Sequence, residues 1–459
     1  MGSSNHRFVF CLTLAGCGGL QTVAASNVPR PATMASSVPA AAPRADRSKP
    51  QITRTLLERR ELPAPPGMES RLYLMTFPPG AASPPHVHTT QGTGYVLEGA
   101  FESAFDDEPT TIKRAGDAFI DVPGKTHHFR NLDPDHPLRF VFSGTFPRGA
   151  PIFRSPDAVV RFAGTGAART IHRPALYPET VDYDAAHRAF VVGSFRDGAI
   201  YRVDGDGRAT PLADDHRLSS TLGIAVDGAH ERLWAVSADI GAGVRRSAAG
   251  PKRSADVAIY DLSTGAVISN VDLAGLVPGP HLLNGIAVDK GGGAYVSDSL
   301  AAAIYRITAD GKGSVFARDD RFAGPGIGLN GLVVHPRGFL LVVKKSDGAI
   351  FKVPLAEPER VSQVKVDGAF VGGDGLTLAG EDDLVVVANA TPDVTTNAAF
   401  ALTTDDNWTS AKVYDVLPLA DDYPTTAVVR DGTLFRVDPP RCAPARGGGG
   451  RPRPGRLPR

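Results

Sequence analysis

The segment GIAVDGAHERLWAVSA, residues 223–238, decides the fold, because variants of it recur along the second half of the chain. Each variant has an apolar run, a turn that contains Asp or Gly, and a second apolar run. Further copies begin at Thr180, Gly285, Gly331, Gly375 and, in shorter form, Thr425. The starts lie roughly 45 residues apart, with one longer gap, and a repeat of this length indicates an array of similar structural units.

Several copies continue into a third apolar run such as AIYRV or AIFKV, and the spacing leaves room for a fourth strand. Units of four short antiparallel strands repeated around an axis form a propeller, in which only short strand edges are exposed. Six copies in phase therefore predict a six-bladed β-propeller over residues 155–438. An array of β-sandwiches is the alternative.

Residues 51–150 predict a second, smaller β domain. Their apolar runs are RLYLMTF, GYVLEGAFESAF, DAFIDVP and LRFVFSGTF, each bounded by Gly, Pro or Asp. Short runs separated by such turn residues are typical of an antiparallel barrel. The chain as a whole is therefore predicted to be all-β, with a small barrel before the propeller.

Histidines are concentrated in two short segments of the predicted barrel. His86-Val87-His88 follows Gly80 by six positions, and His127 precedes Asn131 by four. This pattern resembles the two motifs of the cupin family, which implies a double-stranded β-helix barrel. His86 and His88 alternate with Val87 and so face one side of a strand. With His127 they predict a three-imidazole site for Mn, Fe, Ni, Cu or Zn.

The barrel departs from the family motif at one ligand position. The glutamate usual in cupins falls at Gly92, and the neighbouring Gln91 could supply a weak neutral oxygen. His128 is expected to point away from His127. Three histidines with an open position would still bind a metal. A metal-free cupin used for packing or for dimerisation is the alternative.

Polar residues precede the first strand of four propeller repeats at about the same offset. They are Glu179, Asn284, Asn330 and Asp374. The innermost strands of a propeller line its central channel, so side chains at equivalent offsets converge near the axis. Two carboxylates and two amides predict an oxygen-rich site for a hard divalent cation, calcium first, or Mg, Mn or Zn.

Across residues 155–438 the chain resembles the senescence-marker-protein/gluconolactonase family of regucalcin-like lactonases. The resemblance implies one divalent metal held by Glu179, Asn330 and Asp374, with Asn284 beside it. It also implies lactone hydrolysis, in which the metal polarises the carbonyl and Asp374 and Asn284 are catalytic.

The resemblance fails at residues that recognise the substrate in that family. Leu282 stands where the family has a sugar-contacting arginine, and Gly285 where it has an aspartate. His281, Lys344 and Lys345 could serve a different ligand, or the two lysines could belong to a solvated hairpin.

A metal-dependent hydrolase of the lactonase type, with an accessory metal-binding cupin, is therefore the predicted function. Two alternatives remain open, because a propeller fold alone does not decide function. The propeller could bind a small molecule or a protein without catalysis, or the cupin could be the enzyme and the propeller its scaffold. The absence of a Gly-x-Ser-x-Gly motif argues against a serine hydrolase. Equal numbers of basic and acidic residues, 49 of each, argue against a nucleic-acid partner.

The N-terminus predicts export. Arg7 precedes a short apolar run, and Leu14-Ala15-Gly16-Cys17 resembles a bacterial lipobox, in which the cysteine is lipidated. Residues 1–17 then form the signal and residues 18–50 a disordered linker, so that a periplasmic or outer-membrane lipoprotein is expected. Cleavage after Ala25 and simple secretion is the alternative.

The arginine-rich residues 439–459 contain no acids and are expected to be a disordered tail. Three cysteines in the whole chain argue against a disulfide framework.

Overall fold

The computed structural model describes residues 51–62, 68–106, 108–156, 171, 176–241, 243–245, 247, 250–367, 370–419, 423–430 and 433–437. The predicted signal with Cys17, the linker and the C-terminal tail lie outside these residues. Within them, no helix has the length and apolar character needed to cross a bilayer. A 3-10 turn at Asp320–Phe322 stands among strands, so the all-β prediction is confirmed.

The N-terminal domain is a barrel of two facing five-stranded sheets. The first has the order β1 (Thr53–Glu61), β2 (Met68–Phe77), β9 (Leu138–Pro147), β4 (Gly92–Glu98) and β7 (Ala118–Asp121). The second has the order β10 (Phe153–Arg154), β3 (Ala82–His88), β8 (Thr126–Asn131), β5 (Ala100–Phe105) and β6 (Thr111–Arg114). Aromatic rings fill the space between the sheets, among them Phe77, Phe101, Phe129 and Phe140. Because β10 pairs with β3, the barrel extends past the predicted boundary at residue 150.

The larger domain begins with four four-stranded antiparallel sheets in chain order. The first two consist of β11 (Pro178–Asp184), β12 (Ala189–Ser194), β13 (Ile200–Val203) and β14 (Ala209–Ala213), then β15 (Thr221–Asp227), β16 (Arg232–Ser237), β17 (Asp256–Asp261) and β18 (Val267–Asp272). The next two consist of β19 (Leu283–Val288), β20 (Ala294–Asp298), β21 (Ala303–Ile307) and β22 (Gly313–Arg318), then β23 (Leu329–His335), β24 (Phe339–Lys344), β25 (Ile350–Pro354) and β26 (Ser362–Gln363).

Two further sheets complete the ring in the described residues. The fifth sheet has the order β27 (Lys365–Asp367), β31 (Ser410–Pro418), β30 (Thr395–Thr403), β29 (Asp383–Ala390) and β28 (Gly373–Leu378). The sixth is the pair β32 (Thr426–Arg430) and β33 (Thr433–Val437).

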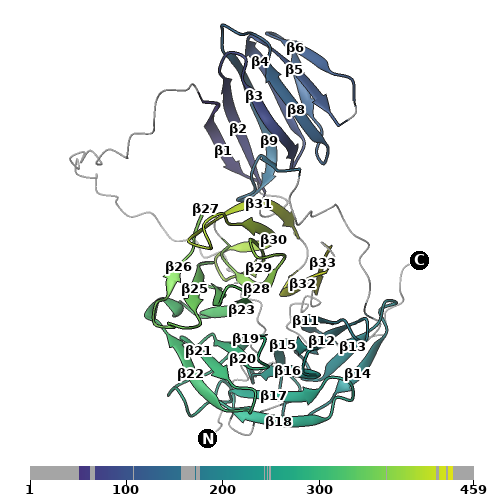
Figure 1. Cartoon of the computed structure of the whole chain (residues 1–459), viewed down its shortest axis with the longest axis vertical. Coiled ribbons are helices and arrows are strands. Elements are labelled where there is room, and N and C mark those ends of the chain that lie inside the picture. Colours follow the sequence, from purple (N-terminus) through teal and green to yellow (C-terminus); the bar gives the residue numbers. More distant parts are fainter. Residues whose placement is uncertain are drawn as a thin grey trace, which may run out of the picture.

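The inner strands β11, β15, β19, β23, β28 and β32 surround the centre of this ring (Figure 1). Each contacts the next, and β32 contacts both β28 and β11, so the ring closes. Each sequence repeat forms the first strands of one sheet, as the repeat analysis predicted. A closed ring does not fit an array of β-sandwiches. The architecture is propeller-like, with a sixth unit of two described strands.

The barrel stands against the outer edge of the fifth sheet, beside β31 (Figure 1). Ala150, at the end of the barrel, packs into the same apolar cluster as Phe400 and Leu402 of that sheet. The guanidinium Nε of Arg154 lies 3.5 Å from Oδ2 of Asp415. Apolar packing at Ala150 and the ion pair of Arg154 with Asp415 therefore connect the two domains.

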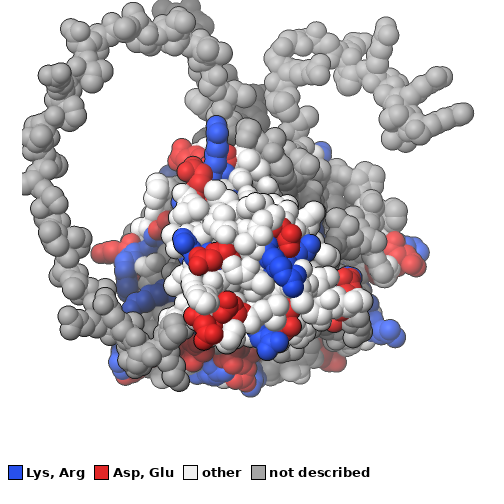
Figure 2. Space-filling model, turned by 90° about the horizontal axis from the view of Figure 1, so that it is seen from above, with Lys and Arg blue, Asp and Glu red and all other residues white. Residues whose placement is uncertain are grey.

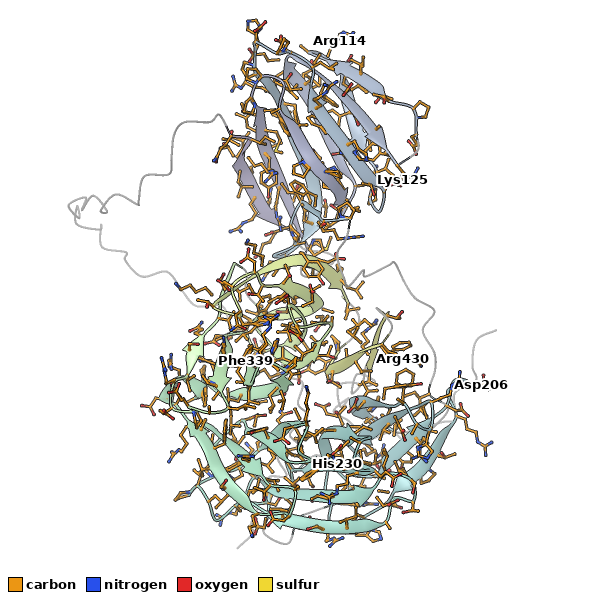
Figure 3. All side chains as sticks on the ribbon, viewed as in Figure 1. Arg114, Lys125, Asp206, His230, Phe339 and Arg430 are labelled. Carbon is orange, nitrogen blue, oxygen red and sulfur yellow. The ribbon has the colours of Figure 1, made fainter. Side chains whose placement is uncertain are left out.

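The surface carries both charge signs. Figure 2 shows basic and acidic residues interspersed among uncharged ones on the face seen from above. In Figure 3, Arg114 lies at the end of the barrel remote from the ring, while Asp206, His230, Phe339 and Arg430 are spread around the ring.

Candidate functional site

The three predicted histidines of the barrel come together in its interior. One ring nitrogen from each of His86, His88 and His127 lies within 4.8 Å of the others, and all three residues are buried. The pairing of β3 with β8 sets His86 opposite His127, so two strands supply the group. His128 is exposed, as predicted. We call His86, His88 and His127 the histidine triad.

Partners outside the triad fix which nitrogens face one another. Nδ1 of His86 lies 2.8 Å from the carbonyl oxygen of Pro84, which leaves Nε2 for the interior. Nε2 of His127 lies 2.8 Å from the hydroxyl of Ser103, and its Nδ1 lies 3.0 Å from Nε2 of His88. Such contacts to the second ring nitrogen are typical of metal-ligating histidines, because they hold the ring in one orientation.

The triad is electrostatically suited to a metal ion. Burial, with the charges of neighbouring histidines, lowers the pKa of His88 and His127 to about 3 and also lowers that of His86. The imidazoles are therefore neutral at neutral pH, which is the form that binds metals. Three neutral nitrogens in a buried cluster fit a transition metal such as Mn, Fe, Ni, Cu or Zn.

Sequence reasoning missed the acid that accompanies the triad. Gln91, the predicted oxygen donor, is exposed, whereas the triad is buried, so the prediction for Gln91 is wrong. Gly92 instead pairs across the sheet with Asp121, which is 4% exposed. Oδ2 of Asp121 lies 3.3 Å from Nε2 of His88, and burial raises the pKa of Asp121 to about 7. The side chain of Gln91, the residue before Gly92, faces away from the triad because neighbouring residues of a strand point to opposite faces.

A second group of polar residues surrounds the axis of the ring. A cavity of about 220 Å³ is lined by residues of all six inner strands or their starts. We call it the propeller channel. It contains all four residues predicted from the repeat openings, Glu179, Asn284, Asn330 and Asp374. Leu222 and Thr425 hold the equivalent places in the other two units.

Backbone irregularities direct these side chains to the channel. The register between the first and second strand shifts at Glu179, at Asn284, at Asn330 and at Asp374. A β-bulge turns the local backbone and re-aims a side chain, and bulges are common beside active sites. The repeated offset in the sequence therefore corresponds to a repeated bulge.

A glycine follows three of these bulged residues, Asn284, Asn330 and Asp374, and it has a steric reason. A Cβ on Gly285 would lie 2.6 Å from the carbonyl oxygen of Asn330, and one on Gly331 would lie 2.4 Å from that of Asp374. Only glycine allows neighbouring inner strands to approach so closely. The Asn-Gly and Asp-Gly pairs are therefore packing features of the channel wall.

A buried lysine lies beside the channel. Nζ of Lys345 donates to Oδ2 of Asp374 at 2.6 Å and to Oδ1 of Asn389, while Nδ2 of Asn389 donates to the same Oδ2 at 2.6 Å. Lys344 and Lys345 are only 8% and 5% exposed, so the alternative of a solvated hairpin is wrong. Lys345 directly follows β24, and Asn389 lies near the end of β29, the strands next to the inner strands β23 and β28 of their sheets.

The charges of this group are coupled. Burial acts to lower the pKa of Lys345, but neighbouring groups together outweigh it, so the pKa is raised and the ammonium stays charged. These groups are Asp374, Tyr423 and Glu179. Burial raises the pKa of Glu179 well above its ordinary value, the charge of Asp374 adds to the rise, and Lys345 opposes it. As the side chains stand, the ammonium of Lys345 occupies Oδ2 of Asp374, so a divalent cation bound by both oxygens of this carboxylate would have to displace it.

The structure buries both Leu282, the departure from the family's arginine, and His281, the candidate for a different ligand. Leu282 is buried in an apolar cluster of the second and third sheets and so contacts no channel ligand. His281 is also buried, with Nδ1 2.8 Å from Oδ2 of Asp298 and Nε2 3.2 Å from the carbonyl oxygen of Ala274. Both residues serve packing, and His281 is not placed to bind a ligand.

Comparison with known protein families gives a match for the N-terminal barrel. Residues 73–144 match the family model of the cupin domain. A protein with a double-stranded β-helix domain from Klebsiella pneumoniae subsp. pneumoniae MGH 78578 is 26% identical over 23% of this chain and 82% of its own, with a TM-score of 0.18. The match to the family model shows a cupin domain at residues 73–144, as the motifs predicted.

The larger domain has structural neighbours of low sequence identity. Virginiamycin B lyase from Staphylococcus aureus is 14% identical over 59% of this chain and 80% of its own, with a TM-score of 0.42. A chain of a nidogen/laminin complex is 18% identical over 53% of this chain and 83% of its own, with a TM-score of 0.38. The search of curated proteins gave no match. The resemblance to the gluconolactonase family stays a prediction.

Proposed function

We propose that the protein is a hydrolase of the lactonase type and that the propeller channel is its active site. The observation that carries the proposal is the convergence of Glu179, Asn284, Asn330 and Asp374 from four repeats on one cavity. Buried charged groups with strongly shifted pKa values, gathered in a concave site, are typical of active sites. The cavity volume of about 220 Å³ suits a small molecule such as a lactone.

Ring opening adds one water molecule across an ester bond, and the channel supplies groups for each part of the step. Both hydrogen bonds that Asp374 accepts from Lys345 and Asn389 go to Oδ2, so Oδ1 is left to take a proton from the attacking water. The amides of Asn284 and Asn330 can donate to the carbonyl oxygen as it becomes negative. The carbon–oxygen bond of the ring then breaks, and Asp374 returns the proton to the leaving ring oxygen.

The positive charge in this site belongs to Lys345. A divalent cation held by Glu179, Asn330 and Asp374, as the family resemblance implies, requires Lys345 to leave Asp374 if it binds both oxygens of that carboxylate. Calcium, zinc, magnesium and manganese are the candidates. The steps above use only residues of the chain, so hydrolysis that persists in a strong chelator favours them over a metal-dependent reaction.

The test is a panel of small lactones with the purified protein, in chelator and with each divalent metal. Asp374→Asn should lower kcat/KM by 100-fold or more, because general-base catalysis contributes typically about 10²–10⁴-fold. Asp405→Asn, in the loop between β30 and β31 of the same sheet and with its side chain 78% exposed, is the matched control. If no lactone is hydrolysed but one binds the wild type, the propeller is a binding module and the hydrolase proposal fails.

We propose a second function for the cupin domain, the binding of one transition-metal ion by the histidine triad. The supporting observation is the mutual distance of at most 4.8 Å between the three ring nitrogens. Metal analysis of the purified chain should find about one transition-metal ion, lost in His86→Ala, His88→Ala. Catalysis in the barrel, with the propeller as scaffold, is the alternative if lactone hydrolysis disappears in that folded variant.

We also propose that the cupin domain mediates a dimer. Tyr95 and Leu97 alternate on β4, and Ile120 of the neighbouring β7 pairs with Thr93, so these side chains share the outer face of one sheet. Tyr95, Leu97 and Ile120 are 47%, 48% and 58% exposed. An apolar group on a sheet face favours association. Sedimentation should show a dimer that Leu97→Lys dissociates.

A further inference from the structure

We propose that Asp121 is the fourth protein ligand of the metal ion in the barrel and replaces the glutamate that position 92 lacks. The inference rests on the metal site proposed above for the histidine triad. It concerns the barrel alone and is independent of the reaction proposed for the propeller channel.

The pairing of β4 with β7 brings Asp121 to the right place. Gly92 and Asp121 are direct partners across this antiparallel pair. Side chains of direct partners point to the same face, with Cβ atoms about 4.5–5.5 Å apart. A carboxylate on β7 therefore enters the barrel on the side where a residue at position 92 would have entered it.

The ring of Phe142 also occupies the space that a glutamate side chain at position 92 would need. A Cβ on Gly92 would lie 2.1 Å from Cζ and 2.2 Å from Cε2 of Phe142, whose ring fills the space beside the glycine. Phe142 belongs to β9, the other neighbour of β4. A glutamate at position 92 would need this ring to move. The barrel thus has an aromatic ring at the family's position and an acid on the strand opposite.

The distances around His88 are those between neighbouring ligands of one ion. Two donor atoms that each lie about 2.1 Å from an ion are about 3.0–3.4 Å apart at octahedral or tetrahedral angles. Nε2 of His88 lies 3.0 Å from Nδ1 of His127 and 3.3 Å from Oδ2 of Asp121. Both Nδ1 of His127 and Oδ2 of Asp121 therefore lie at the distance from Nε2 of His88 that is expected between two ligand atoms of one ion.

Asp121 is also the kind of residue that needs an ionic partner. Its side chain is buried, and a buried carboxylate is unfavourable unless it is paired or coordinates a metal. Three imidazoles with one carboxylate form a mixed nitrogen–oxygen ligand set, which suits Mn, Fe, Co, Ni or Zn in the divalent state.

The test uses the full-length chain loaded with Co²⁺, whose visible spectrum reports the number and type of ligands. Affinity is measured by competition with a chromophoric chelator. The variants are Asp121→Asn and, as a matched control, the exposed Asp135→Asn. The His86→Ala, His88→Ala variant gives the signal of any Co²⁺ bound elsewhere in the chain.

We expect Asp121→Asn to lower Co²⁺ affinity by at least tenfold and to change the visible spectrum, while Asp135→Asn behaves as wild type. Lower affinity with an unchanged spectrum would make Asp121 a positioning residue and overturn its role as ligand. Unchanged affinity would overturn it too.

Thermal unfolding of the metal-free proteins shows whether Asp121→Asn is folded. If it is not, Asp121→Glu keeps the carboxylate and should retain binding with a shifted spectrum. Weaker Co²⁺ binding in a folded Asp121→Glu with the same spectrum as the wild type would count against Asp121 as a ligand. If wild type and the double histidine variant bind Co²⁺ alike, the triad site itself fails, and Asp121 with it.

Discussion

Replacing Lys345 by methionine tests the arrangement of the propeller channel most directly. Lys345 is 5% exposed and Asp374 is 7% exposed, with Nζ and Oδ2 2.6 Å apart. Methionine keeps a long unbranched side chain and removes the charge and its hydrogen bonds. Asp374 then retains the bond from Asn389 but remains a buried carboxylate without a cation, close to Glu179.

The expected loss of stability follows from these contacts. Removing one partner of a buried ion pair costs about 3–5 kcal/mol, because the other charge stays buried and unpaired. We expect a value near the lower limit, about 3 kcal/mol, since Asn389 still donates to Asp374 and the channel admits water. At about 2–4 °C per kcal/mol for a domain of this size, the Tm of the propeller should fall by roughly 6–12 °C.

Differential scanning calorimetry in chelator measures this shift. The double variant Lys345→Met, Asp374→Asn removes both charges and should recover most of the loss. Calcium should stabilise Lys345→Met more than wild type, because the cation finds a free carboxylate. A Tm within about 1 °C of wild type in chelator, or equal calcium stabilisation of both proteins, would refute the buried ion pair.

Three further predictions address the two sites and their surroundings. His86→Ala, His88→Ala should keep most of any lactone hydrolysis while losing the transition metal of the barrel, and activity lost in a folded form would place the chemistry there instead. Gly92→Glu should cost at least about 1–3 kcal/mol in chemical denaturation, because its Cβ would overlap the ring of Phe142, and unchanged stability would contradict that packing. Burial raises the pKa of Asp182 to about 6, so the folded protein keeps this proton between about pH 4 and 6 where the unfolded chain has lost it, and stability falls as pH rises through that window. Asp182→Asn should therefore gain on wild type by about 1–3 kcal/mol from pH 4 to pH 7, and parallel stability curves would exclude this.

Local patterns in the sequence were sufficient for much of the barrel site. The alternation of His86 and His88 on one strand places both rings on one face, whatever the rest of the fold does. The fixed spacing of the second motif identified His127. Asp121 had no such signal, because its role depends on the register between β4 and β7, which joins residues far apart in the chain.

In the propeller, too, some features could be predicted from the sequence and others depended on the tertiary structure. A repeat that recurs at constant spacing requires equivalent positions to face the axis, so Glu179, Asn284, Asn330 and Asp374 could be predicted as a group from the sequence. Only the tertiary structure shows how these four side chains are directed and which charged partner they have. Bulges aim the four side chains, and the packing of adjacent sheets buries Lys345 against Asp374. Periodicity is a local property that a single sequence records, whereas the partner of a buried charge depends on which non-neighbouring strands meet.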